Sequence, residues 1–283
     1  MKESPRISTL FPDIFNVHSP ITVGSNALIV SASLLSLKEV QILPMVQGLQ
    51  PVVDHETKIK MFATLGEYSV LEAIGKSEPR DYLKLLWTEC DEVPTWIGSV
   101  KFSDTLDDLL NVFQRTKFGN AAIEDESMGH PGLVTLKDIV SLYRSGRLRT
   151  SVRVSEISSE RVSTPLDSTI TDALQLMFKK RIRRVFHAGY DLQFTSSRDI
   201  IRFLFSPQKL EAVKKTPGTW LDARLSDFVP SRANSVPDGA PIIEAARQIG
   251  DGVDDCLVCE SNQQIVSRWD IVMKPWEEGI MGI

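Results

Sequence analysis

The sequence lacks any apolar run of the roughly 18 residues that a membrane-spanning helix needs. Its first residues also lack the apolar segment of a secretory signal. We therefore expect a cytoplasmic protein that does not cross a membrane. The composition, with 42% hydrophobic and 24% charged residues in 283, is that of a folded globular protein with one large core or two modest ones.

Cysteine is scarce, and histidine shows no metal-binding pattern. The three cysteines are Cys90, Cys256 and Cys259, and the close spacing of the last two is compatible with a redox or zinc motif. However, these two residues fall in a short apolar stretch that looks like a buried strand. Residues three apart on a strand point to opposite faces, so we predict buried structural thiols without a metal. Four scattered histidines offer no second ligand: His18, His55, His130 and His187.

Motifs of common enzyme classes are absent as well. The chain has no glycine-rich phosphate loop with its lysine, no nucleophile elbow, no zinc-protease motif and no dinucleotide-binding glycine pattern after a strand. We therefore expect that it is not an enzyme. A net charge of −5 without a long basic stretch also argues against nucleic-acid binding. The one basic cluster runs from Lys179 to Arg184.

A four-residue pattern, Ser or Thr followed three positions later by an acid, recurs after apolar stretches. Its four copies are Thr64 to Glu67, Thr135 to Asp138, Ser196 to Asp199, and Ser267 to Asp270. The intervals between them are 71, 61 and 71 residues. A single copy would be no more than a helix capping box, but four copies in register predict an internal repeat.

Two further patterns accompany each copy. Upstream, apolar residues at helical spacing predict an amphipathic helix. These sets are Leu28, Ser31, Ala32, Leu35; Leu106, Leu109, Leu110, Phe113; Ile170, Ala173, Leu174, Met177; and Ile242, Ala245, Ala246, Ile249. A short apolar run, predicted as a strand, then leads to the motif strand; the runs are 42–46, 121–123, 184–186 and 256–258. Expected N-caps are Ser25, Asp104, and Asp167 or Ser168.

This order, with a hydrophobic strand that ends in Ser or Thr and an acid three residues on, resembles the CBS (cystathionine-beta-synthase) domain. The resemblance implies a mixed α/β (α+β) fold of four CBS repeats, each strand-helix-strand-strand-helix. It also implies two pseudo-twofold modules, each a pair of repeats. We place one module at 1–150, with repeats at about 15–80 and 93–145, and the other at 151–283, with repeats at about 154–208 and 225–276.

Similarity to CBS domains also implies a regulatory, ligand-sensing role. Such domains bind AMP, ADP, ATP or S-adenosylmethionine in clefts between paired repeats, as ligands rather than cofactors. By resemblance, the motif acid would accept hydrogen bonds from ribose hydroxyls, and the Ser or Thr would lie near the phosphate. A carboxylate can accept from two neighbouring hydroxyls, and a helix N-terminus suits an anion, so the chemistry supports these roles.

The four sites are expected to be unequal. Glu67 of repeat 1 is longer than the aspartate elsewhere, and would overshoot a ribose. Repeat 4 carries Asp251, Asp254 and Asp255 where repeat 3 carries a series of arginines, so a phosphate would be repelled in one and attracted in the other. We therefore expect binding in the 151–283 half, at repeat 3. There Arg183 or Arg184, which strand alternation aims at opposite faces, would bind the phosphate.

Simpler interpretations remain open. The four motifs could merely cap helices, and the basic cluster could be a solvated helix C-terminus that complements the helix dipole. In that case, the chain would be a ligand-free scaffold or adaptor for oligomerisation, as a homodimer or with a protein partner. Nucleic-acid binding is the least favoured class, because of the net negative charge.

Overall fold

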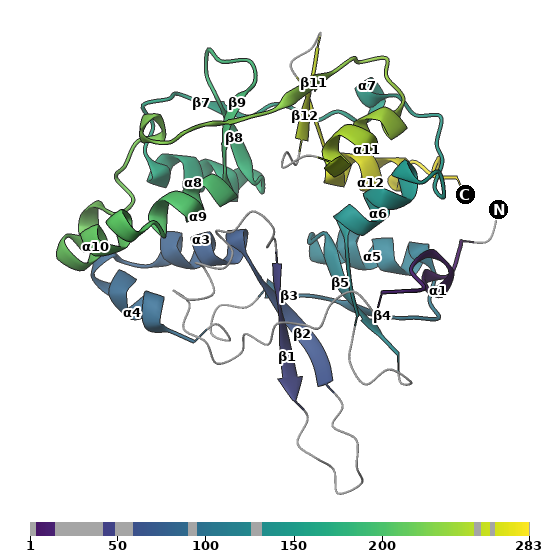
Figure 1. Ribbon diagram of the computed structural model, residues 1–283, viewed down its shortest axis with the longest axis horizontal. Helices are drawn as coiled ribbons and strands as arrows, with labels where there is room; N and C mark the ends of the chain where they lie inside the picture. Colours follow the sequence, from purple (N-terminus) through teal and green to yellow (C-terminus); the bar gives the residue numbers. More distant parts are fainter. Residues whose placement is uncertain are drawn as a thin grey trace, which may run out of the picture.

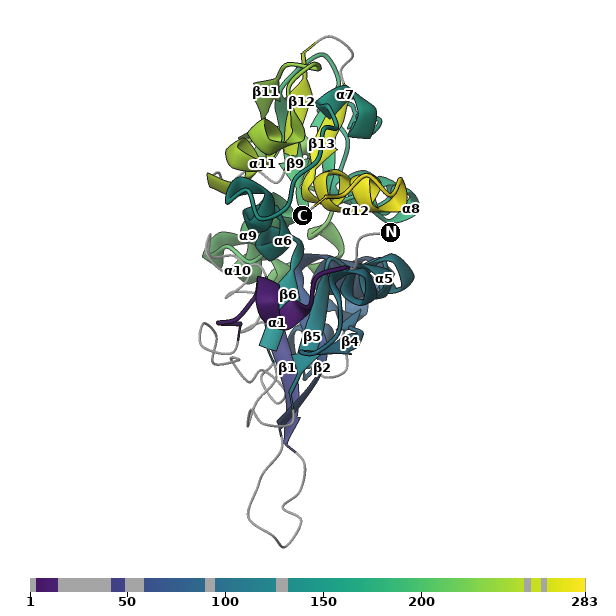
Figure 2. The ribbon, with the colours of Figure 1, turned by 90° about the vertical axis from the view of Figure 1, so that its right-hand side faces the viewer.

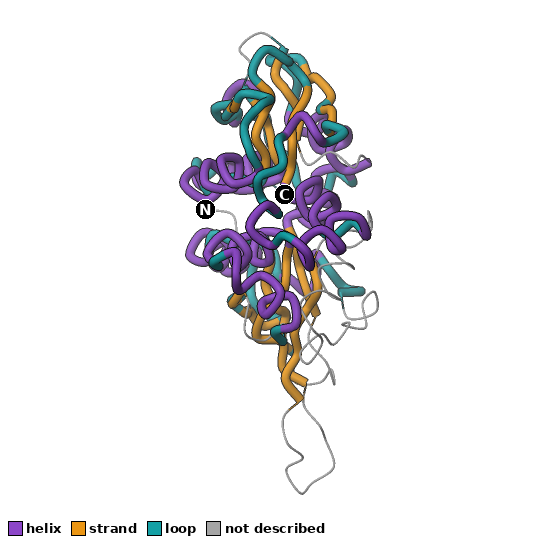
Figure 3. Tube along the Cα trace, turned by 90° about the vertical axis from the view of Figure 1, so that its left-hand side faces the viewer, coloured by secondary structure: helices purple, strands orange, loops and turns teal. Residues whose placement is uncertain are grey.

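The computed structural model describes residues 4–14, 42–48, 59–89, 95–125, 132–251, 256–260 and 264–282. Its strands form four small sheets, one for each predicted repeat. Figure 1 shows the four sheets around the rim of a disc, and Figure 3 shows the helices as a band between the upper and lower sheets. The mixed α/β fold and the four-repeat organisation are confirmed.

Repeats 2, 3 and 4 have the same order of elements. In repeat 2 these are β4 (Ser99–Lys101), α5 (Leu106–Thr116), β5 (Asn120–Glu124), β6 (Gly132–Thr135) and α6 (Leu136–Arg144). In repeat 3 they are β7 (Ser163–Thr164), α8 (Ile170–Lys180), β8 (Arg184–His187), β9 (Gln193–Ser196) and α9 (Ser197–Leu204). In repeat 4 they are β11 (Asn234–Val236), α11 (Ile242–Asp251), β12 (Cys256–Cys259), β13 (Ile265–Ser267) and α12 (Arg268–Glu277).

Within each of these repeats the first helix connects two parallel strands, and the motif strand runs antiparallel to the second of them. Parallel strands need such a crossover, whereas antiparallel neighbours need only a short turn. The motif residue always pairs with the first residue of the strand before it. These pairs are Thr135 with Asn120, Ser196 with Arg184, and Ser267 with Cys256.

Repeat 1 is described from its hairpin onward. It comprises β1 (Ile42–Gly48), β2 (Ile59–Gly66) and α3 (Glu67–Lys76), and the hairpin extends away from the disc in Figure 1. The predicted first helix of this repeat, with its cap Ser25, lies outside the described residues. So do Cys90, Asp254 and Asp255.

Shorter elements link the repeats. The helices are α1 (Ile7–Leu10), α4 (Tyr82–Trp87), α7 (Val154–Ile157) and α10 (Pro207–Lys215). The 3-10 turns are η1 (Pro79–Asp81), η3 (Pro217–Thr219) and η4 (Leu225–Asp227). Two linker strands, β3 (Thr95–Trp96) and β10 (Ser231–Arg232), add antiparallel to β2 and β9. In repeats 1 and 3, the segment that leads to the next repeat therefore adds a strand beside the motif strand.

Apolar cores join the repeats in two directions. Between the upper and lower sheets, one core combines helices of repeats 2 and 4, and another combines α3, α8 and α9 of repeats 1 and 3. In the upper half, Phe186 and Phe194 of repeat 3 share a third core with Cys256 and Val258 of repeat 4. Figure 2 shows the flat profile of the disc, with α6 and α12 between the sheets. The module boundary after residue 150 stays a prediction.

The three helical stripes within the described residues are confirmed, because all twelve of their side chains are buried. The predicted N-caps, in contrast, lie one or two residues too early. Thr105 and Thr169 cap α5 and α8, and each hydroxyl accepts from the backbone N–H three residues on. The aspartate at that third position, Asp108 or Asp172, accepts in return from the cap backbone, which completes a capping box.

The repeat 1 motif also needs a correction of two residues. Gly66, not Thr64, ends the motif strand, pairs with the first residue of β1 and precedes the helix. Ser69, not Glu67, stands three positions after it, and its hydroxyl accepts from the Gly66 backbone N–H at 3.2 Å. The predicted repeat 1 motif, Thr64 to Glu67, is therefore placed two residues too early. Repeat 1 has neither a motif hydroxyl nor a motif carboxylate at the equivalent places.

Candidate functional site

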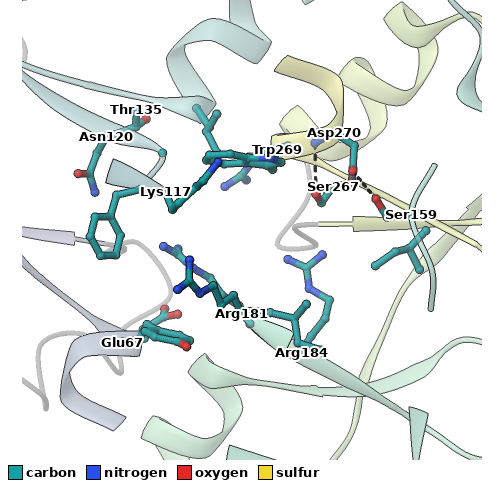
Figure 4. A pocket seen from close by; sticks show the side chains of 18 of the residues that line it. Glu67, Lys117, Asn120, Thr135, Ser159, Arg181, Arg184, Ser267, Trp269 and Asp270 are labelled. Carbon is teal, nitrogen blue, oxygen red and sulfur yellow. Dashed lines mark hydrogen bonds between the residues drawn. The ribbon is translucent and has the colours of Figure 1, made fainter. Parts of the chain in front are cut away.

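A central cavity of about 960 Å³ lies where the four repeats meet. Its lining residues come from helices, strand ends and linkers of every repeat. Figure 4 shows Lys117, Arg181, Arg184 and Trp269 with their side chains reaching into it. A volume of this size is at the upper end of what small-molecule sites occupy, and exceeds what one buried water would need.

The cavity lining is rich in positive charge, although the whole chain has a net charge of −5. Among the described residues the lining includes eight cations: Arg115, Lys117, Lys137, Arg181, Arg183, Arg184, Arg198 and Arg268. The lining acids are five: Glu67, Glu72, Glu160, Asp270 and Glu277. Four of these acids lie within ion-pair distance of a lysine or arginine. A concave surface of this kind concentrates positive potential and attracts anions.

The repeat 4 motif opens onto the cavity. Asp270 accepts from the Ser267 backbone N–H at 2.8 Å and from the Ser267 hydroxyl at 2.6 Å. Its other oxygen accepts from the hydroxyl of Ser159, at 2.6 Å, and lies 3.5 Å from the Lys274 ammonium. Ser159 belongs to the linker that leads into repeat 3 and forms a bridge with β13. The Asp270 carboxylate is thus held in place. The Ser159 hydroxyl occupies a position on it that the hydroxyl of a ligand could take instead.

The repeat 2 motif contributes Thr135, while Asp138 lies behind it and does not line the cavity. Asp138 accepts from the Thr135 backbone N–H and hydroxyl, both at 2.7 Å. Asn120, across the strand pair from Thr135, is buried, lines the cavity and has a side-chain oxygen without a hydrogen-bond partner among the described residues. A buried polar atom of this kind is costly, and a bound group could satisfy it.

The repeat 3 motif faces a much smaller space. Ser196 and Asp199 line a pocket of about 30 Å³, together with Arg183 and Arg184. Asp199 accepts from Ser196 and, at 3.0 Å, from the hydroxyl of the linker residue Ser231. This pocket has room for about one water rather than a nucleoside. The site that the sequence favours therefore has the expected residues but lacks the space.

The repeat 1 acid has a structural role. Glu67 accepts from Arg198 at 2.7 Å and from the hydroxyl of Ser197 at 3.0 Å, and thus ties the start of α3 to the start of α9. The Glu67 and Arg198 side chains are each only 9% exposed. Thr64 is buried in β2 and does not line the cavity. Neither Thr64 nor Glu67 is therefore arranged as a ribose ligand.

Burial shifts the pKa of two groups near the site in the direction that favours their uncharged forms. Burial, and then the neighbouring Glu72, raises the pKa of Tyr68, which lines the cavity as a neutral phenol. Burial lowers the pKa of His187, despite the opposing effect of Asp199, and its Nε2 lies 2.9 Å from the Thr195 hydroxyl. The positively charged side chains that line the cavity are lysines and arginines.

Sequence reasoning misjudged several lining residues. Arg183 and Arg184 both line the cavity, since Arg183 precedes β8 and strand alternation does not apply to it. Trp269 follows the repeat 4 motif directly and also lines the cavity. Lys117 and Arg181 were overlooked as a pair. Both residues directly follow the first helix of a repeat, and this shared position could have identified them in the sequence.

Cys256 and Cys259 are buried in β12, and neither forms a disulfide within the described part of the chain. Burial raises the pKa of Cys259 to about 11. At pH 8 only about one thiol in a thousand would then be ionised, so we expect Cys259 to resist alkylation until the protein unfolds. Thiol titration with and without denaturant would check this, and fast reaction of both thiols in the folded protein would contradict it.

Within the described residues, no cluster of His, Cys, Asp and Glu side chains has the arrangement of a metal site. The expectation that Cys256 and Cys259 bind no metal stays a prediction; stoichiometric zinc that survives dialysis would contradict it. The described helices also include none with the length and apolar character of a membrane span.

The fold is that of a protein with four CBS repeats arranged as a disc. No protein-family model and no curated protein matches the sequence. A solved structure from Methanocaldococcus jannaschii, of a proposed archaeal homologue of g-AMPK, has a TM-score of 0.76 at 13% identity, covering 94% of this chain and 99% of that one. An uncharacterised Pyrococcus horikoshii protein has a TM-score of 0.50 at 11% identity, covering 81% and 95%. A CBS domain protein from Pyrobaculum aerophilum, complexed with AMP, has a TM-score of 0.32 at 22% identity, covering 42% and 89%.

Proposed function

We propose that this protein is a regulatory sensor, not an enzyme, which binds an adenine nucleotide or another adenosyl ligand in its central cavity. The observation that carries the proposal is a single cavity of about 960 Å³ that joins the repeat 4 motif to eight cations. Ribose hydroxyls are suited to the motif carboxylate, and phosphates are suited to the cations. No catalytic group is required by this role.

The repeat 4 motif is the best place for the ribose. Asp270 opens onto the large cavity, whereas Asp199 faces the small pocket. A ribose hydroxyl would take the place of the Ser159 hydroxyl on Asp270, and exchange one hydrogen bond for another. Trp269, one residue before Asp270, offers an aromatic face to the base.

Regulation would follow from the position of the cavity between the two halves of the disc. A ligand that contacts Lys117 in the lower half and Arg184 in the upper half favours one relative placement of the two. The ligand can shift the equilibrium between two placements of the halves only if it binds one of them more tightly than the other. In the cytoplasm, a protein partner or a second copy of the chain would bind one placement of the two halves in preference to the other.

Native mass spectrometry after gentle purification tests the proposal. A retained mass of an adenosyl ligand, or a thermal shift with AMP, ADP, ATP or S-adenosylmethionine, is the expected result. A ligand at 100 times its dissociation constant stabilises the fold by about 2.7 kcal/mol, which a thermal shift assay detects. Protein that is consistently empty and unshifted by all four would refute it.

A ligand-free scaffold is the second candidate, and one observation favours it. The motif carboxylates of repeats 3 and 4 are already bonded to linker hydroxyls, from Ser231 and Ser159. These bonds join neighbouring repeats without any ligand. An empty protein that forms a stable oligomer would support this function.

A further inference from the structure

The segment that connects repeat 2 to repeat 3 contacts the repeat 4 motif on its way. This linker carries the chain from the lower half of the disc to the upper half in Figure 1. Ser159 in the linker donates its hydroxyl proton to Asp270 at 2.6 Å, and Figure 4 shows this bond at the cavity. The backbone of Ser159 also forms both hydrogen bonds of an antiparallel bridge with Ile265 of β13. The linker between the two halves therefore bonds directly to the motif carboxylate.

Lys274 of α12 fixes the same stretch of linker. Its ammonium donates to the backbone carbonyls of Ile157 and Ser158, both at 2.7 Å, and to the Ser159 hydroxyl at 3.1 Å. The Asp270 side chain is only 6% exposed while Ser159 is bonded to it. A ligand hydroxyl therefore gains room on this carboxylate oxygen when Ser159 leaves. We call Ser159, Asp270 and Lys274 the linker latch.

A second linker serine occupies the equivalent place in repeat 3. Ser231 pairs with the residue two positions before the motif serine, as Ser159 does in repeat 4. Its hydroxyl lies 3.0 Å from each carboxylate oxygen of Asp199. Asp199, however, faces a pocket of about 30 Å³, whereas Asp270 faces the cavity of about 960 Å³. Of these two contacts, the one made by Ser159 lies where a ligand has room.

We propose that the linker latch is an autoinhibitory contact, which a ligand with free sugar hydroxyls opens by displacing Ser159 from Asp270. The inference rests on the proposed function and adds its regulation. When a ligand hydroxyl bonds to the Asp270 oxygen, Ser159 loses its acceptor, and the linker between the two halves is held only by Lys274 and the backbone bridge. Ligand binding and the serine bond exclude each other at this oxygen, so occupancy of the site is coupled to the attachment of the linker.

Three variants of the full chain test this competition. Ser159→Ala removes the competing hydroxyl and is expected to bind ATP about three- to tenfold more tightly than the wild type, which corresponds to about 0.7 to 1.4 kcal/mol, the net range of one hydrogen bond. Ser159→Thr keeps a hydroxyl and should bind ATP like the wild type. Ser231→Ala removes the equivalent hydroxyl beside the small pocket, so ATP affinity should change less than about twofold.

A ligand control and a structural readout accompany the variants. 2′,3′-Dideoxy-ATP lacks both sugar hydroxyls and cannot replace Ser159 on Asp270, so Ser159→Ala should leave its affinity unchanged. Hydrogen exchange followed by mass spectrometry reports on the linker itself. ATP should raise the exchange of peptides that contain residue 159 in the wild type, and Ser159→Ala should show the raised exchange without ligand.

Isothermal titration of the wild type and the three variants with both nucleotides separates the outcomes. If ATP binds Ser159→Ala no more tightly than the wild type, the inference fails while the proposed function stands. Equal tightening for ATP and dideoxy-ATP would also overturn the inference, because the serine would then restrict the cavity in general rather than compete for Asp270. If ATP binds neither the wild type nor Ser159→Ala, this inference fails. The proposed function then fails too, unless AMP, ADP or S-adenosylmethionine still gives a thermal shift.

Discussion

Glu67→Ala is expected to lower the free energy of unfolding by about 3 to 5 kcal/mol, the range for removal of one partner from a buried ion pair. The substitution would leave the Arg198 guanidinium buried without its carboxylate, and would leave the Ser197 hydroxyl without an acceptor. Both partners lie at the start of α9, so the loss falls on the contact between repeats 1 and 3. Urea unfolding followed by circular dichroism measures the effect.

Two controls make this measurement specific. In the double variant Glu67→Ala/Arg198→Ala, no buried charge remains unpaired, so its loss should be smaller than the sum of the two single losses. Glu72→Ala breaks an exposed pair with Lys76, at 2.8 Å, and should cost less than about 1 kcal/mol. Equal losses of unfolding free energy for Glu67→Ala and Glu72→Ala would show that the buried pair contributes no more to stability than the exposed pair.

Asp270→Asn is expected to weaken ATP binding by about ten- to a hundredfold, since a hydrogen bond to a charged group contributes about 1.5 to 3 kcal/mol. Asparagine has nearly the same shape as aspartate, but its amide nitrogen cannot accept from a ribose hydroxyl. Isothermal titration gives the change in affinity. A melting curve recorded beside it separates lost binding from lost folding, because Asp270 also holds Ser159 and Lys274.

Asp199→Asn is the matched control, because Asp199 has the same place in repeat 3 and a similar linker serine. Its pocket of about 30 Å³ does not accept a nucleoside, so ATP affinity should change less than about threefold. A larger effect of Asp199→Asn than of Asp270→Asn would return the site to repeat 3, where the sequence alone had placed it.

The difference between these two carboxylates shows where sequence reasoning reached its limit. Ser196 to Asp199 and Ser267 to Asp270 are equivalent motifs, and nearby arginines favoured the first. The space beside each one depends on how the linkers and neighbouring repeats are placed. Ser231 and the beginning of α9 line the small pocket beside Asp199, while Asp270 opens onto the cavity at the centre of the disc.

The repeats and most of their elements could be predicted from the sequence, because the patterns that indicate them are local. Helical stripes such as Leu106 to Phe113 and the strand starting at Cys256 follow from periodicity, which neighbouring residues dictate. The motif spacing predicted four units of one fold. Repeat 1 was misaligned by two residues because Gly66 has no side chain to mark the helix start.

The contacts between repeats, in contrast, became visible in the folded structure. Glu67 contacts Arg198 across 131 positions of sequence, and Lys117 and Arg181 meet at one cavity from different repeats. No local pattern encodes such distances, because they depend on how the helices of repeats 1 and 3, and of repeats 2 and 4, pack into shared cores. The sequence shows the basic residues, but the fold is what brings those of different repeats to one cavity.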